Sequence, residues 1–176
     1  LGIIDDREPI PAVIKLIFHV VAACIVVVGE NLAITNIGVF FEVYESHDFF
    51  LIQFILAVIA ITASINAFNM IDGIDGLAAS MALLALIHTL ISFDIIHGGA
   101  PPNYNTFAFL FAGALAGFLM FNLNIFNSRK VFLGDSGSML IGLMIAIALI
   151  GASQDSSRLT QGPNIPPVLC LWILAI

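Results

Sequence analysis

Carboxylates and amides gather between residues 66 and 78, in the sequence NAFNMIDGIDGLA. This stretch holds two amides, Asn66 and Asn69, and two carboxylates, Asp72 and Asp75, between long apolar runs. Acids in so apolar a setting are costly unless they face water, a metal ion or a substrate. Helical spacing would let the amides share a face with the acids. The stretch is therefore a candidate site for chemistry.

Two further acidic motifs are DDRE, with Asp5 and Asp6, and GDSGS, with Asp135. A solvated loop is the alternative for DDRE. Helix capping is the alternative for Asp75 and Asp135, because each precedes an apolar run and Asp is a good N-cap residue. Capping does not explain Asp72 or the two amides, so the motifs together favour a functional site.

The elements that must position these motifs are apolar. Hydrophobic residues make up 60% of the chain and charged residues 10%, with a mean hydropathy of +1.09. A soluble domain carries about a quarter charged residues, and a β-barrel would alternate in polarity. The predicted fold class is therefore an all-α, polytopic transmembrane helical bundle of about six spans. The spans are expected at residues 12–29, 49–65, 77–93, 107–121, 139–152 and 165–176.

The connections between these spans predict the topology. Two spans separate each acidic motif from the next, so all three motifs should share one face of the membrane. Residues 94–105 are expected to form a turn-rich loop on the other face. The shared face is expected to be cytoplasmic, because it carries most of the basic residues. Those are Arg7, Lys15, Arg129 and Lys130, against Arg158 on the opposite side.

The net charge and the two ends of the sequence limit the possible partners and domain organisation. The net charge of −7 argues against nucleic acid. The chain begins without Met and ends inside an apolar run. Residues 1–176 are therefore expected to be a single membrane-embedded domain that is truncated at both ends.

The ligand chemistry favours a hard cation. No Cys or His cluster lies near the acids, so zinc and copper fit poorly. Carboxylate and amide oxygens suit Mg²⁺ or Mn²⁺, which is usually shared with substrate phosphates. Phe132, next to the third motif, is either an interfacial anchor or a ring that stacks on a base.

Three stretches, LGIIDDRE, NAFNMIDGIDGLA and VFLGDSGS, carry a family resemblance. In order and spacing they resemble the polyprenyl-phosphate N-acetylhexosamine-1-phosphate transferases over essentially the whole chain. The sequence is most similar to the branch that transfers GlcNAc-1-phosphate from UDP-GlcNAc to undecaprenyl phosphate, which starts O-antigen and enterobacterial common antigen. The alternative is the branch that transfers phospho-MurNAc-pentapeptide in peptidoglycan synthesis, which usually has TDGLDGL in its second motif.

The resemblance implies a role for each matching residue, an Mg²⁺-dependent reaction and a location in the bacterial inner membrane with the site facing the cytoplasm. The implied partners are a UDP-sugar, a polyprenyl phosphate, the lipid bilayer and, as an option, a second copy in a homodimer. Pro9 stands where one version of the first motif, DDxxD, has a third aspartate. The family's His-rich motif and its first spans have no counterpart in these residues. The implied roles are catalysis for Asp5, Asp6 and Asp72, substrate binding for Lys15, Asn69, Asp75, Asn122 and Phe132, and metal binding for Asp135 and Asp72.

Two other classes of membrane protein stay open at this point. A cation-coupled transporter would place its acids near the middle of the spans. An intramembrane aspartyl protease would need two facing aspartates within the membrane, and would leave the other acids and amides unused.

Overall fold

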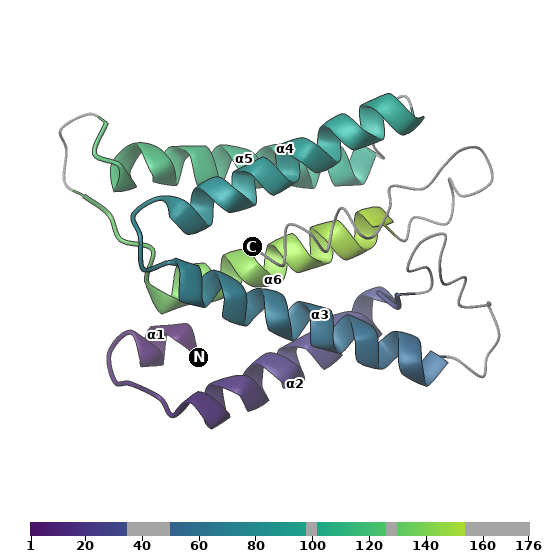
Figure 1. Cartoon of the computed structure of the whole chain (residues 1–176), viewed down its shortest axis with the longest axis horizontal. Coiled ribbons are helices and arrows are strands. Elements are labelled where there is room, and N and C mark those ends of the chain that lie inside the picture. Colours follow the sequence, from purple (N-terminus) through teal and green to yellow (C-terminus); the bar gives the residue numbers. More distant parts are fainter. Residues whose placement is uncertain (35–49, 98–101, 126–129, 154–176) are drawn as a thin grey trace.

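The computed structural model describes residues 1–34, 50–97, 102–125 and 130–153. Within these ranges the regular structure is entirely helical (Figure 1). The predicted fold class, a polytopic helical membrane protein, is confirmed. The helices are α1 (Gly2–Asp5), α2 (Ala12–Glu30), α3 (Phe50–Ile71), α4 (Leu77–His97), α5 (Pro102–Asn122) and α6 (Gly134–Ser153).

Three of the described helices, α2, α3 and α6, are long and apolar enough to cross a membrane. The helices α4 and α5 contain shorter apolar segments, Leu77–Ile91 and Thr106–Asn122. Large apolar side chains such as Phe18, Ile59 and Phe109 are exposed, as expected of a surface that faces lipid tails. The span predicted at 165–176 lies outside the described residues.

Helix ends differ from the sequence-based boundaries at two places, of which the end of α3 belongs to the site. The helix α3 continues through Asn66 and Asn69 to Ile71, beyond the end at residue 65 that the apolar run predicts, and this agrees with the helical spacing of the two amides. The turn-rich loop predicted for 94–105 is wrong for the described part of that stretch, because α4 runs to His97 and α5 begins at Pro102. Proline is tolerated there, since the first helical turn has no partner for its N–H groups.

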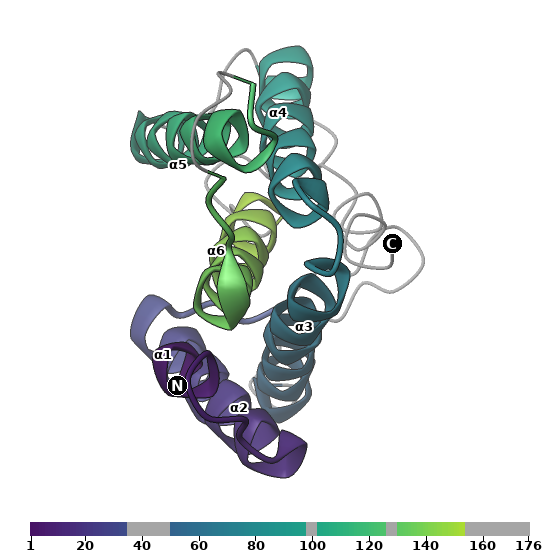
Figure 2. The same ribbon diagram turned by 90° about the vertical axis from the view of Figure 1, so that its left-hand side faces the viewer.

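The helix α6 occupies the centre of the bundle (Figure 2). It packs against α3 and α4, while α2 covers α3 and α5 covers α4. The contact between α3 and α6 is close: a Cβ at Gly142 would lie 2.7 Å from the Ile65 Cα. The buried Ser64 hydroxyl donates to the Gly142 carbonyl oxygen at 2.8 Å. Small residues of this kind let helix backbones approach one another in lipid.

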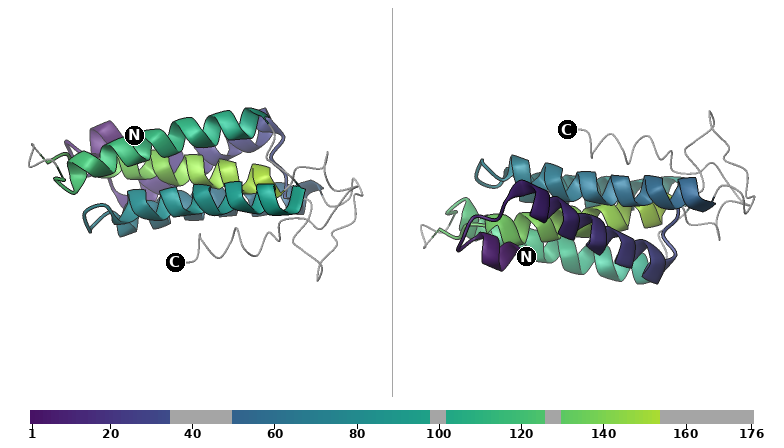
Figure 3. Two further views of the ribbon diagram at one scale, coloured as in Figure 1. Left: turned by 90° about the horizontal axis from the view of Figure 1, so that it is seen from above. Right: turned by 90° about the horizontal axis from the view of Figure 1, so that it is seen from below.

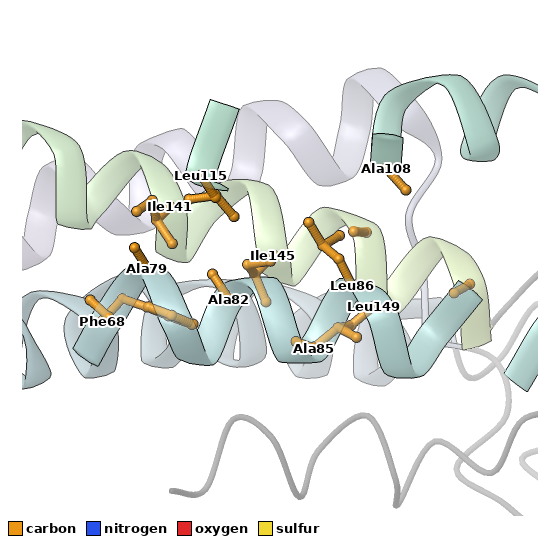
Figure 4. Close-up of a cluster of buried hydrophobic side chains, with 13 residues drawn as sticks. Phe68, Ala79, Ala82, Ala85, Leu86, Ala108, Leu115, Ile141, Ile145 and Leu149 are labelled. Atoms are coloured by element: carbon orange, nitrogen blue, oxygen red, sulfur yellow. The ribbon is translucent and has the colours of Figure 1, made fainter. Parts of the chain in front are cut away.

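Small alanine side chains on α4 let α6 pack closely against it (Figure 4). Ala79, Ala82 and Ala85 are almost fully buried against larger side chains of α6, among them Ile145 and Leu149. A closely packed interior of this kind resists deformation. The helix ends are therefore held in fixed relative positions.

All three acidic motifs lie at one end of the bundle, the left-hand end in Figure 1. The N-terminus with α1, the turn from α3 to α4 and the segment that enters α6 meet there, as the views in Figure 3 also show. The predicted common location of the motifs is thus confirmed. Which side of the membrane this end faces stays a prediction.

Candidate active site

Asp5 is the buried member of the adjacent aspartate pair. Its side chain is 1% exposed and forms an ion pair with the Lys15 ammonium. Its Oδ1 accepts a hydrogen bond from the Ile10 N–H at 2.8 Å. The Lys15 contact, followed by the Ile10 hydrogen bond, lowers the pKa of Asp5 to about 2. Asp5 is therefore ionised throughout the physiological pH range.

Lys15, in the first turn of α2, connects two of the motifs. Its Nζ contacts Asp5 and lies 3.7 Å from the Asp135 Oδ2. The Lys15 side chain is 22% exposed and that of Asp135 38% exposed, so the cluster opens toward the end of the bundle. Two carboxylates from distant parts of the chain thus share one ammonium.

Asp6 points to a different helix from Asp5. Its Oδ1 accepts the Asp135 N–H at 2.7 Å, and its Oδ2 accepts the Ser136 Oγ–H at 2.6 Å and the Ser136 N–H at 3.3 Å. The bond from the Ser136 hydroxyl is the main reason that the pKa of Asp6 is lowered. Asp6 therefore supplies the cap at the start of α6.

Asp135 lies inside the first turn of α6. Its backbone N–H is donated to Asp6, so the capping alternative fails for Asp135. The Asp135 carboxylate stays partly exposed beside Lys15, where a ligand could reach it.

The Asn69 amide faces α6. Its Oδ1 accepts a hydrogen bond at 2.9 Å from the hydroxyl of Ser138, a fully buried residue. Asn69 therefore retains its Nδ2 hydrogens for other acceptors. The neighbouring amide behaves differently, because the Asn66 Nδ2 donates to the Thr62 carbonyl oxygen within the same helix.

Asp72 follows the last residue of α3 and carries a perturbed carboxyl. Partial burial raises the pKa of Asp72, and nearby negative charges raise it further. Those charges are on Asp135, Asp75 and Asp6. The site therefore holds more negative charge around Asp72 than its own residues neutralise, which favours a bound cation.

The remaining predicted residues lie along the segment that enters α6. Lys130 forms an ion pair with Asp75, and its Nζ lies 5.4 Å from the centre of the Phe132 ring. Phe132 is 72% exposed. The buried Asn122 donates from Nδ2 to the Val131 carbonyl oxygen at 2.8 Å. Asn122 thus ties this segment to α5, and its predicted contact with substrate stays a prediction.

The donor set fits a magnesium ion that is shared with a substrate. No group of three or more His, Cys, Asp or Glu side chains in the described ranges could hold a metal ion alone. Mg²⁺ is commonly bound by one or two carboxylates together with phosphate oxygens and water. Asp72 and Asp135 could supply such a pair.

Two serines of the site, Ser136 and Ser138, were not among the sequence-predicted residues. Ser136 contacts Asp6, and Ser138 contacts Asn69. The signal was their place in GDSGS, where hydroxyls at a helix start commonly make local hydrogen bonds. Their actual partners lie in other motifs, which spacing alone did not reveal.

Comparison with known proteins identifies the family of the chain. The sequence profile described as Glycosyl transferase family 4 matches residues 1–153. The undecaprenyl-phosphate alpha-N-acetylglucosaminyl 1-phosphate transferase of Escherichia coli O157:H7 is 32% identical over the whole chain, which corresponds to 46% of that protein. Its Salmonella typhi counterpart is 39% identical over 39% of the chain and 17% of its own length. The decaprenyl-phosphate N-acetylglucosaminephosphotransferase of Mycobacterium tuberculosis (strain ATCC 25618 / H37Rv) is 44% identical over 38% of the chain and 16% of its own length. The chain therefore belongs to glycosyl transferase family 4.

Proposed function

We propose that the protein transfers N-acetylglucosamine-1-phosphate from UDP-GlcNAc to undecaprenyl phosphate and releases UMP. The observation that carries this proposal is the cluster of Asp5, Lys15 and Asp135, with Asp72 close by, at one end of the helical bundle. A lysine among acids at the end of apolar helices suits a reaction between a soluble pyrophosphate and a lipid-borne phosphate. The names of the related enzymes support both the sugar and the polyprenyl acceptor.

The reaction joins two anions, so charge neutralisation is the main task of the site. An oxygen of the lipid phosphate attacks the β-phosphorus of UDP-GlcNAc, the bond from this phosphorus to the bridging oxygen breaks, and UMP departs with that oxygen. Lys15 can move toward the negative charge of the reacting phosphates, because its ammonium is shared between two carboxylates and is partly exposed. The free Nδ2 of Asn69 can donate to a phosphate oxygen. Such chemistry depends on in-line placement and electrostatics more than on covalent help.

The acids differ in how well they accept a proton. Asp5, with its lowered pKa, is a poor base and serves to hold Lys15. In the metal-free site Asp72, with its raised pKa, is the better acceptor for the proton that a monoprotonated lipid phosphate would lose. A bound cation would lower this pKa, and Asp72 would then act as a ligand and not as a base. A phosphate monoester is already largely ionised near neutral pH, so this help is needed for only part of the substrate.

Asp72 and Asp135 would hold the Mg²⁺ ion, and Mn²⁺ would suit the same oxygens. When bound, such an ion neutralises pyrophosphate oxygens and the charge that develops on the leaving group. Phe132, exposed at the edge of the site beside Lys130, is available to stack on the uracil ring.

The cytoplasmic face of a bacterial inner membrane is the proposed location. Arg7 follows α1, and Lys15 and Lys130 form ion pairs with acids of the site. Basic residues favour the cytoplasmic side. The product would start an O-antigen or common-antigen type of glycan. A transporter is disfavoured, because these acids lie at the helix ends rather than at mid-span.

The test is release of UMP by the purified full-length protein in lipid nanodiscs. We expect release from UDP-GlcNAc only when undecaprenyl phosphate and Mg²⁺ are both present. UDP-MurNAc-pentapeptide is the competing donor, and a preference for it would assign the protein to the peptidoglycan branch. No UMP from either donor, in protein that remains folded, would refute the transferase proposal.

A further inference from the structure

The two adjacent aspartates of the first motif are held in unlike ways. Asp5 is buried and neutralises Lys15. Asp6 contacts the start of α6, where its two oxygens accept hydrogen bonds from Asp135 and Ser136. Three of the roughly four acceptor positions of this carboxylate are thus taken by protein donors, which leaves little capacity to bind substrate as well.

We propose that Asp6 is a positioning residue that caps α6 from a distant part of the chain and so places Asp135 in the site. This inference rests on the proposed function, because the site that Asp6 organises is the one assigned to phosphate transfer. Asp6 and Asp135 are 129 positions apart in the sequence. The contact therefore joins two motifs that otherwise belong to separate parts of the bundle.

The start of α6 needs such a partner. The first N–H groups of a helix have no acceptor within the helix, and a negative charge there is favoured by the helix dipole. Caps normally come from the residue just before the helix. The helix α6 begins at Gly134, and neither this glycine nor Leu133 before it has a side-chain acceptor, so Asp6 provides the acceptors instead.

Two glycines make room for this contact. A Cβ at Gly2 would overlap the backbone of Ser136, so α1 sits directly against the first turn of α6. A Cβ at Gly134 would lie 3.0 Å from the Asp6 Oδ1, and Gly134 has a φ of +69° that other residues rarely adopt. The close approach of α1 to α6 thus depends on both glycines.

Loss of this cap would also affect the proposed metal ligand, because Asp135 is the residue whose N–H Asp6 accepts. The Asp135 N–H is fixed by Asp6, while the Asp135 Oδ2 lies 3.7 Å from the Lys15 Nζ. If the cap is lost, the first turn of α6 is free to fray, and the Asp135 carboxylate loses its fixed distance from Lys15. Asp6 then acts on the reaction through Asp135 and not by contact with the reacting phosphates.

Three variants separate positioning from direct catalysis: Asp6→Asn, Asp6→Ala and Asp5→Asn. In Asp6→Asn the remaining oxygen can accept the Asp135 N–H, and the new Nδ2 can donate to the Ser136 Oγ, so kcat should stay within about tenfold of the wild type. Asp6→Ala removes every acceptor and should lower kcat about tenfold more, with a higher Mg²⁺ concentration for half-maximal rate. Asp5→Asn should lose about a hundredfold or more, because the Lys15 ammonium loses its charged partner.

A double-mutant cycle tests the path of the effect. Ser136→Ala removes the 2.6 Å bond to Asp6 and should slow the reaction when Asp6 is present. In the Asp6→Ala background the same change should have no further effect, because its influence passes through Asp6. Additive losses would contradict the proposal.

Hydrogen exchange provides a measurement that does not depend on activity. The rate of amide exchange in a peptide over residues 131–140 should be higher than in the wild type for Asp6→Ala. It should be close to the wild-type rate for Asp6→Asn and equal to it for Asp5→Asn. Unchanged exchange in Asp6→Ala would overturn the proposal, as would an Asp6→Asn protein that is as inactive as Asp5→Asn with normal exchange. A wild-type protein that releases no UMP would refute the proposed function, and the exchange result would still decide whether Asp6 holds α6.

Discussion

Ser138 Oγ donates a 2.9 Å hydrogen bond to the Asn69 Oδ1, joining the beginning of α6 to the end of α3. Ser138 is fully buried, so water does not compete for this bond. Because Ser138 occupies the amide oxygen, Asn69 presents its Nδ2 hydrogens elsewhere. The orientation of a predicted substrate-binding amide is therefore set by a serine of another motif.

Ser138→Ala should reduce kcat/KM about tenfold, because a buried hydrogen bond contributes about 1 kcal/mol and leaves an unpaired partner when it is removed. The protein should remain folded. Steady-state kinetics with UDP-GlcNAc measure the loss. Ser80→Ala, a matched change near the start of α4, should stay within about twofold of the wild type. An unchanged kcat/KM in Ser138→Ala would mean that Asn69 needs no such support.

The ion pair between Asp75 and Lys130 predicts a coupled effect on nucleotide binding. Both side chains are more than a third exposed, so the pair contributes at most about 1 kcal/mol to stability. The pair also connects the turn after α3 to the segment that carries Phe132, so we expect it to hold that segment in place. Asp75→Asn and Lys130→Met should each raise the KM for UDP-GlcNAc about threefold to fivefold, with kcat little changed.

The double variant of this pair should be no worse than the worse single variant, because either change releases the same segment. Additive increases in KM would instead indicate that Asp75 and Lys130 contact the substrate independently. Melting temperatures of all three proteins serve as the control for folding.

Asp72 predicts a pH effect whose sign follows from its surroundings. Burial and neighbouring carboxylates raise the pKa of Asp72, so in metal-free protein it should protonate at a higher pH than an ordinary aspartate. Asp75→Asn removes one of those negative charges and should lower the pKa of Asp72. Carboxyl ¹³C NMR of Asp-labelled protein without Mg²⁺ measures the midpoint. Glu30→Gln, at the far end of α2, should leave that midpoint unchanged, and a shift of equal size there would remove the local explanation.

The sequence predicted the helical membrane fold because composition and apolar run length determine it with little ambiguity. The runs at 12–29 and 77–93 match α2 and α4 closely at their first residues. The predicted end of α3, residue 65, falls short of Ile71 because the apolar run stops where the amides begin. The helix continues through them, and Asn66 satisfies its amide by donating back to the Thr62 carbonyl oxygen within α3.

The sequence predicted which residues belong to the candidate site but not which of them contact one another. Parity of the spans correctly brought DDRE, the central acidic stretch and GDSGS to one end of the bundle. Spacing could not tell that Asp5 and Asp6 point to different partners, because adjacent residues leave the backbone in different directions. Those partners, Lys15 and the start of α6, are fixed by tertiary packing.

The orientation of the bundle in the membrane can be tested with single cysteines in a protein without Cys24 and Cys170. Glu30→Cys lies at the end of α2 away from the site, and Gly73→Cys lies in the turn after α3. A Cβ at Gly73 would meet no atom within 4 Å, so the change should be tolerated. In intact cells an impermeant maleimide should label position 30 and spare position 73. Labelling of position 73 from outside would place the site on the external face.

Asp135→Asn should abolish most activity if the Asp135 carboxylate holds Mg²⁺. The change keeps the shape of the side chain and the backbone N–H that Asp6 accepts, so α6 should remain capped. It removes a charged oxygen ligand, and the rate should fall about a hundredfold or more. A Mg²⁺ titration of UMP release should show a higher half-saturating concentration than in the wild type. Glu30→Gln, which removes one carboxylate at the other end of the bundle, should leave rate and Mg²⁺ requirement unchanged. A near-normal rate with an unaltered Mg²⁺ requirement in Asp135→Asn would exclude Asp135 as a metal ligand.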